Sequence, residues 1–157
     1  TPDPQAMLDD AIRLENGLYI LSPADMICHA AAHLFADGDL AGGLRNLWDI
    51  DRLLRDFGEQ VGFWQALRQR AVRHELAKPV SRAVRLAEAV YGTPVDGDVA
   101  GRGRRGDALY IRRLLARDGW GCETRKGTRL AFYVRSHWLR MPPLMLARHL
   151  WTKWRKS

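Results

Sequence analysis

Residues 22–57 carry the strongest pattern in this chain, two amphipathic helices separated by a short turn. The segment SPAD at 22–25 is a helix start, because it offers a capping hydroxyl, a proline at the first helical position and an acid in the first turn. Apolar residues then recur every three or four positions, and Gly38 ends the helix because glycine accepts a left-handed conformation. A second apolar stripe over 44–57 predicts a partner helix. We therefore expect a helical hairpin.

Two histidines and two aspartates are the main polar candidates on this hairpin. His29 and His33 are four residues apart, so they lie on one helical face. Asp49 and Asp51 are two apart and diverge by about 200° on a helix, so they cannot both face the same partner. We expect His33 and Asp49 to form a buried polar contact that holds the two helices in register, because buried polar groups find partners.

A metal site is the alternative interpretation of the same residues. His29 and His33 project from one face, and Asp49 could supply a third ligand, as in a metal-dependent hydrolase. The residue after His29 is Ala30, where the metalloprotease pattern has its catalytic glutamate. We therefore assign neither metal ligands nor catalytic residues to this chain.

The composition is that of a globular protein. With 157 residues, 46% of them hydrophobic and 27% charged, one domain with a single core is expected. No apolar run approaches the length of about 18 residues that spans a membrane. The two cysteines provide no disulfide framework, and Cys28 lies beside the apolar stripe as an expected inert core thiol. A cytoplasmic location fits these features.

Charge is distributed unevenly along the chain. Residues 1–60 hold four basic and eleven acidic side chains, whereas residues 61–157 hold twenty-one basic and seven acidic ones. Such asymmetry favours an anionic partner for the second half. The basic, tryptophan-containing end at 144–157 could lie on a membrane surface, and nucleic acid is another candidate. A self-contained basic helical module that binds one of these two is our alternative function.

The remaining periodicity predicts an all-α fold, an antiparallel multi-helix bundle with one short strand at 18–21. Short connections between successive helices favour this arrangement. The expected organisation is a linker or remnant of an upstream domain (1–21), a four-helix core (22–94), a glycine- and arginine-rich loop (95–106) and basic helices packed on the core (107–157). Beyond the hairpin, helices are predicted at 6–14, 63–73, from Pro79 to about 91, at 108–117, from 127 or 128 to about 141, and at 144–154.

The loop 95–106 contains the pattern Gly-x-Gly-x-x-Gly at 101–106. That pattern binds dinucleotides only where a buried strand precedes it, and the residues before this copy are polar. We therefore interpret it as a loop. Arg102, Arg104 and Arg105 are weak candidates for contact with a phosphate.

A string of matching segments carries a family resemblance. The segments are LSPAD at 21–25, His29 to Phe35, LRNLWDI at 44–50, Leu53-Leu54, Phe63-Trp64, Ala83 to Leu86 and YGTP at 91–94. Together they resemble the carboxyl-terminal helical part of the uncharacterised nucleotidyltransferase family of bacteria, in the polymerase-β-like superfamily. The resemblance covers about half of the chain and is weaker over 107–157.

The resemblance implies a division of labour. Enzymes of that superfamily hold two magnesium ions and a nucleoside triphosphate with a Gly-Ser helix start, an Asp-x-Asp strand and a third carboxylate. Asp49-x-Asp51 does not reproduce this, because on a helix the two carboxylates diverge. The resemblance thus implies that this chain is a helical companion of an upstream catalytic domain and contacts nucleotide or acceptor. His33 and Asp49 match recurring family positions, and His29 and Asp51 are weaker candidates.

Overall fold

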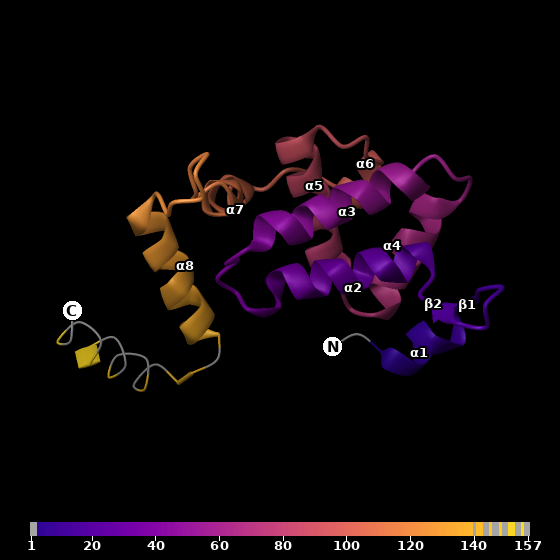
Figure 1. The fold of residues 1–157 in the computed structure, drawn as a ribbon, viewed down its shortest axis with the longest axis horizontal. Helices are drawn as coiled ribbons and strands as arrows, with labels where there is room; N and C mark the ends of the chain where they lie inside the picture. The colour runs from indigo at the N-terminus through magenta and orange to yellow at the C-terminus, as the bar shows by residue number, and fades with distance from the viewer. Residues whose placement is uncertain are drawn as a thin grey trace.

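A computed structural model describes residues 3–139, 141–142, 145, 148, 151–152 and 155, and the described chain is mostly helical (Figure 1). The helices are α1 (Pro4–Asp9), α2 (Pro23–Ala36), α3 (Gly43–Phe57), α4 (Phe63–Arg73), α5 (Ala77–Tyr91), α6 (Gly97–Ala100), α7 (Asp107–Leu114) and α8 (Lys126–Trp138), and the strands are β1 (Ile12–Arg13) and β2 (Tyr19–Ile20). This confirms the all-α prediction.

Helices α2 to α5 share one hydrophobic core. α2 packs against α3, α4 and α5, and α3 also packs against α5. The largest side chains that are removed from solvent come from all four helices and include Ile27, Leu47, Leu67 and Leu86. Ser22 caps α2 by accepting the N–H of Asp25, and the apolar stripes of α2 and α3 face each other as expected.

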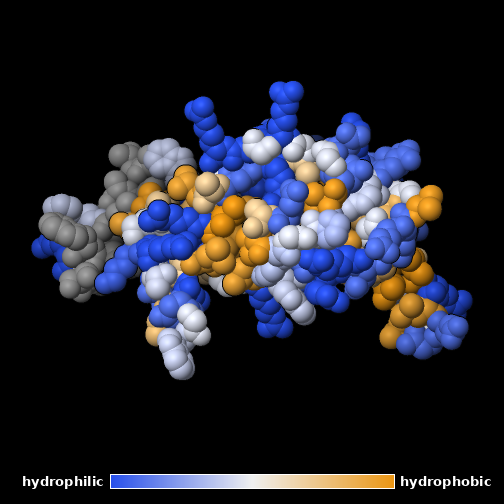
Figure 2. All heavy atoms as spheres, turned by 90° about the horizontal axis from the view of Figure 1, so that it is seen from above, coloured by the Kyte–Doolittle hydropathy of each residue, from blue (hydrophilic) through white to orange (hydrophobic). Residues whose placement is uncertain are grey.

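The amino-terminal strand has a partner that the sequence pattern did not reveal. Residues 12–13 were expected to be helical, but β1 pairs antiparallel with β2, with Ile12 opposite Ile20. The helix ends early, because α1 closes at Asp9. The β-hairpin formed by β1 and β2 projects from one end of the molecule. Figure 2 shows hydrophobic side chains gathered at this end, at the right of the view.

Several predicted helix boundaries need correction. α5 begins at Ala77 rather than Pro79, because a proline is tolerated throughout the first turn. The loop 95–106 contains the short helix α6, and α7 ends at Leu114 rather than near 117. The predicted helix 144–154, and with it the proposed membrane contact of 144–157, lies mostly outside the described residues.

Helix α8 lies at the end of the molecule opposite the β-hairpin and contacts the turn between α2 and α3 (Figure 1). The Arg135 Nη1 atom donates to the Gly38 carbonyl at 2.6 Å. A Cβ atom on Gly38 would lie 3.2 Å from the Ser136 Cα, and the φ of Gly38 is +74°. Glycine is therefore required here by both space and backbone conformation. In the described part of the chain, no helix combines the length and the apolar character needed to cross a membrane.

Candidate functional site

An exposed polar pocket lies between α2 and α3. His29 and His33 contribute to it from α2, and Asn46 and Asp49 from α3, around a volume of about 250 Å³. The two imidazoles share a face, as their spacing predicts, with ring centroids 5.0 Å apart in an edge-to-face contact. Three of the four side chains are exposed, with Asn46 half-buried, so the pocket is open to a ligand from solvent.

The expected buried contact between His33 and Asp49 is wrong. Both side chains are exposed, and within the described residues no hydrogen bond joins them. At an exposed position water satisfies the polar atoms of each residue. A pair of such residues therefore does not fix the register of the two helices. Contact of His33 or Asp49 with a substrate stays a prediction.

Asp51 points away from that pocket into the protein, as its spacing from Asp49 predicted. The buried carboxylate accepts the Thr93 hydroxyl at 2.6 Å and the Arg55 Nε at 2.7 Å. The same guanidinium donates its Nη2 to the Tyr91 carbonyl at 2.9 Å. Asp51 thus joins α3 to the end of α5, which indicates a structural role.

Two arginines of α5 and the end of the 95–106 loop hold a second buried acid, Asp107. Asp107 accepts Arg85 Nε at 2.7 Å, Arg82 Nε at 3.2 Å and the backbone N–H of Arg104 at 3.2 Å. Burial raises the pKa of this carboxyl, but these donors outweigh burial and leave the pKa below its usual value. The side chains of Arg102, Arg104 and Arg105 themselves are exposed. Their contact with a phosphate stays a prediction.

The Gly-x-Gly-x-x-Gly pattern at 101–106 has no strand before it. The helix α6 precedes it instead, and the pattern forms a loop that leads into α7. This geometry differs from the strand–turn–helix arrangement of dinucleotide sites. The interpretation of the pattern as a loop is therefore confirmed.

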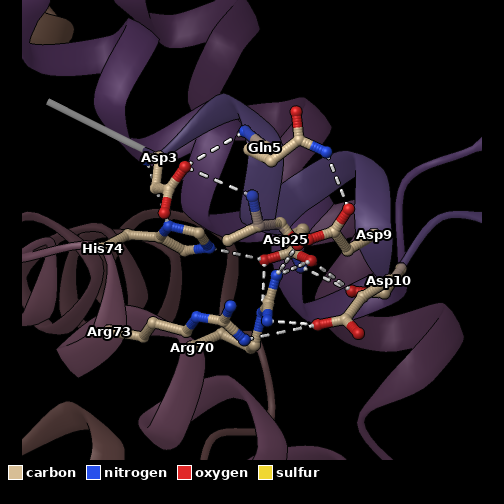
Figure 3. A network of polar contacts seen from close by, with 10 residues as sticks. Asp3, Gln5, Asp9, Asp10, Asp25, Arg70, Arg73 and His74 are labelled. Atoms are coloured by element: carbon tan, nitrogen blue, oxygen red, sulfur yellow. Dashed lines mark hydrogen bonds and ion pairs between the residues drawn. The ribbon is translucent and has the colours of Figure 1, made fainter.

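The most extensive polar network in the described chain centres on Asp25, which the sequence analysis treated only as a helix-start residue (Figure 3). Its side chain is 0% exposed. Arg70 donates Nε to one carboxylate oxygen at 2.8 Å and Nη2 to the other at 2.7 Å. Ser22 donates its hydroxyl at 2.8 Å, and His74 donates Nε2 at 3.0 Å. Four donors occupy all of the lone-pair sites of this carboxylate.

The network also fastens the amino-terminal segment to the core. The Asp3 N–H donates to His74 Nδ1 at 3.3 Å, so the proton of a neutral ring lies on Nε2, where it points at Asp25. Arg70 Nη2 also donates to the Ala6 carbonyl at 2.9 Å, and its Nη1 contacts Asp10. One acid therefore joins α1, α2 and α4.

Electrostatics favour the charged form of Asp25. Burial raises the pKa of the carboxyl, but the hydrogen bonds from Arg70, Ser22 and His74 together hold it below its usual value. The neighbouring Cys28 thiol is 0% exposed, and burial raises its pKa to about 12. Cys28 is therefore an inert core thiol, as predicted.

A spacing signal for this network was present in the sequence. Arg70 of α4 and His74, which caps the end of that helix, are four residues apart, the same spacing as His29 and His33, and lie on one side. Spacing alone did not show that the face is buried or that Asp25, 45 residues before Arg70, lies opposite.

The buried acids do not fit a two-magnesium centre. Magnesium needs free carboxylate oxygens, whereas Asp25, Asp51 and Asp107 each accept from at least one arginine. The exposed pocket offers two imidazoles and one carboxylate, a poor donor set for this hard cation. Over the described residues, no group of three or more histidine, cysteine or acidic side chains could hold a metal ion.

Comparison with known families agrees with the resemblance of the helical core. The family described as uncharacterised nucleotidyltransferase matches residues 1–92, more than half of the chain. The chain belongs to this family. The match begins at the first residue, earlier than the expected Leu21, and it includes α1 to α5 with the exposed pocket and the Asp25 network. No curated protein and no solved structure matches the chain.

Proposed function

We propose that this nucleotidyltransferase-like chain is the helical, substrate-contacting part of a longer transferase, and that its pocket between α2 and α3 contacts the nucleotide or the acceptor. The family match over residues 1–92 carries the proposal, because the matched region contains both helices of the pocket. The carboxylates that would hold magnesium are assigned to an upstream domain of the same polypeptide.

The chemistry of the pocket supports contact with a polar substrate. His29 and His33 can donate or accept hydrogen bonds, and an imidazolium can pair with a phosphate. Asn46 and Asp49 face them from α3, and an amide beside a carboxylate suits hydroxyl and amino groups of a base or sugar. The buried acids, in contrast, are occupied by internal partners.

Reading the coding sequence upstream of Thr1 tests whether an upstream domain carries the carboxylates that would hold magnesium. We expect a Gly-Ser helix start followed by an Asp-x-Asp strand. A start codon directly before Thr1 would refute the proposal of an upstream catalytic domain.

A binding experiment tests the pocket. Nucleoside triphosphates are titrated into the chain while the imidazole signals are followed by NMR. We expect the signals of His29 and His33 to shift, with the buried His74 unchanged. The variant His33→Asn should weaken binding about tenfold, which corresponds to the loss of one hydrogen bond to a charged group.

Asp56→Asn is the matched control, because Asp56 is exposed on α3 outside the pocket. It should leave binding unchanged. Equal effects of the two variants, or shifts at His74 without shifts at His29 and His33, would contradict the placement of the substrate.

A further inference from the structure

Helix α8 turns an apolar face toward solvent. Leu130, Val134 and Trp138 recur every four residues and therefore share one side of the helix. Leu130 and Trp138 are each 60% exposed, and Val134 is half-buried. A helix on the surface of a globular protein normally shows solvent its polar side. Helix α8 thus carries apolar residues on its solvent side as well as on its buried side.

Specific contacts hold α8 in this orientation. On its inner side the ring of Phe132 meets Tyr110 of α7 edge-to-face, with centroids 5.2 Å apart. Arg135 donates to the Gly38 carbonyl, and the backbone of Ser136 lies so close to Gly38 that a Cβ atom there would be 3.2 Å from the Ser136 Cα. Rotation of α8 about its axis would break these contacts, so the outer apolar face stays outside.

The segment before α8 presents another exposed aromatic side chain. Trp120 is 93% exposed and lies in a tight turn closed by a bridge between Arg117 and Glu123. The Asp118 carboxylate accepts the N–H of Trp120 at 3.0 Å and that of Cys122 at 2.8 Å. These bonds order the turn, so Trp120 is displayed by a structured backbone.

Basic residues outnumber acids in the segment that carries the exposed apolar residues. Residues 108–139 contain seven arginines or lysines and two acids, Asp118 and Glu123. Both acids have partners within the protein, since Asp118 binds backbone N–H groups and Glu123 contacts Arg117 and Arg129. A net positive potential therefore accompanies the apolar face.

We propose that Trp120 and the outer face of α8 (Leu130, Val134 and Trp138), together called the docking face, bind the surface of an anionic lipid bilayer. Basic residues would attract the headgroups, and the apolar side chains would enter the boundary between headgroups and acyl chains. Tryptophan is favoured at that depth.

A nucleic acid explains this face less well. It would complement the arginines and could stack on Trp120, but it offers no hydrocarbon phase for Leu130 and Val134. The docking face lies beyond residues 1–92, so the inference does not depend on the proposed transferase role.

Vesicle co-sedimentation of the full chain tests the inference. We expect at least tenfold stronger binding to vesicles of mixed phosphatidylglycerol and phosphatidylcholine than to phosphatidylcholine alone. Raising salt from about 0.1 to 1 M shortens the Debye length from about 10 to about 3 Å and should weaken binding several-fold. The variant Leu130→Glu/Trp138→Glu should lose at least tenfold in affinity, because it places two charges on the inserted face.

Leu18→Glu is the matched control, because Leu18 lies on the distant β-hairpin and is as exposed as Leu130. This variant should bind vesicles as well as the wild type does. Thermal unfolding should be the same for all variants. If the double variant unfolds early, Trp120→Ser supplies the same comparison from outside α8 and should lower affinity severalfold.

Three results would overturn the inference: wild-type affinity in the α8 double variant, indifference to lipid charge, or no vesicle binding. Binding to a fluorescent oligonucleotide that depends on Leu130 and Trp138, without vesicle binding, would assign the face to nucleic acid instead.

Discussion

The Asp25 network should dominate the stability of the core, and Asp25→Asn tests this directly. The carboxylate accepts from Arg70 twice, from Ser22 and from His74, all within 3.0 Å. An asparagine keeps one acceptor oxygen and turns an N–H₂ group toward donors, so at most two of the four bonds survive. Arg70, whose side chain is 12% exposed, then loses its buried counter-charge.

The expected cost is about 3–5 kcal/mol in free energy of unfolding, the range observed when one partner of a buried ion pair is removed. Domains of this kind are stable by only about 5–15 kcal/mol in total. With a urea slope of about 2 kcal/mol per M, the midpoint should fall by about 1.5–2.5 M. Urea titration followed by far-UV circular dichroism measures this shift.

The pH dependence of the difference in free energy of unfolding between wild type and Asp25→Asn provides a second test. The pKa of Asp25 in the folded protein lies below that of a free aspartate, because hydrogen bonds from Arg70, Ser22 and His74 outweigh burial. Its charged form therefore stabilises the fold above the unfolded pKa, and this contribution disappears as pH falls through the folded pKa. The free energies of unfolding of wild type and Asp25→Asn should therefore differ by the full amount at neutral pH and approach each other in acid.

Asp56→Asn is the control, because Asp56 forms an exposed pair with Arg52 at 3.9 Å, and its replacement should change stability by less than about 0.5 kcal/mol. A loss below about 1 kcal/mol for Asp25→Asn, or a difference that grows in acid, would refute the reasoning.

Further predictions concern Asp51 and the thiols. Thr93→Val removes the hydroxyl that donates to buried Asp51 at 2.6 Å, and it should cost about 1–3 kcal/mol in thermal or urea unfolding; an unchanged midpoint would contradict a structural role for this bond. A thiol reagent should label exposed Cys122 rapidly and Cys28 only after unfolding, because Cys28 is buried and its pKa is about 12; peptide mapping of the labelled protein distinguishes the two, and fast labelling of native Cys28 would show that the core opens readily.

Local signals in the sequence predicted the helical core. The capping serine and the apolar periodicity placed α2, and the same periodicity placed α3 and α4, because both signals act within a few residues of the helix they define. The divergence of Asp49 and Asp51 followed from helical geometry alone. The burial of Cys28 followed from its place beside the apolar stripe.

Predictions failed where the local signal was weak or where a partner lies far along the chain. The pairing of β1 with β2 was missed, because two-residue strands carry almost no periodic signal. Of the polar pocket residues, His29, His33 and Asp49 were identified and Asn46 was not. The exposure of the pocket was not predicted, because spacing gives the relative direction of side chains without showing which neighbours cover them. Asp25 was named only as the acid in the first turn of the helix, because its partners Arg70 and His74 lie 45 and 49 residues away.

The sequence by itself thus determined the helices of the core and which of their side chains share a face, because these depend on short-range geometry. Only the tertiary structure decided which face is covered. In α8, apolar residues occur on both sides, and the packing of Phe132 against Tyr110 left Leu130 and Trp138 in solvent. In α2, an acid that could have been solvated became the centre of a buried network, because folding brought an arginine of α4 and the histidine that follows this helix against it.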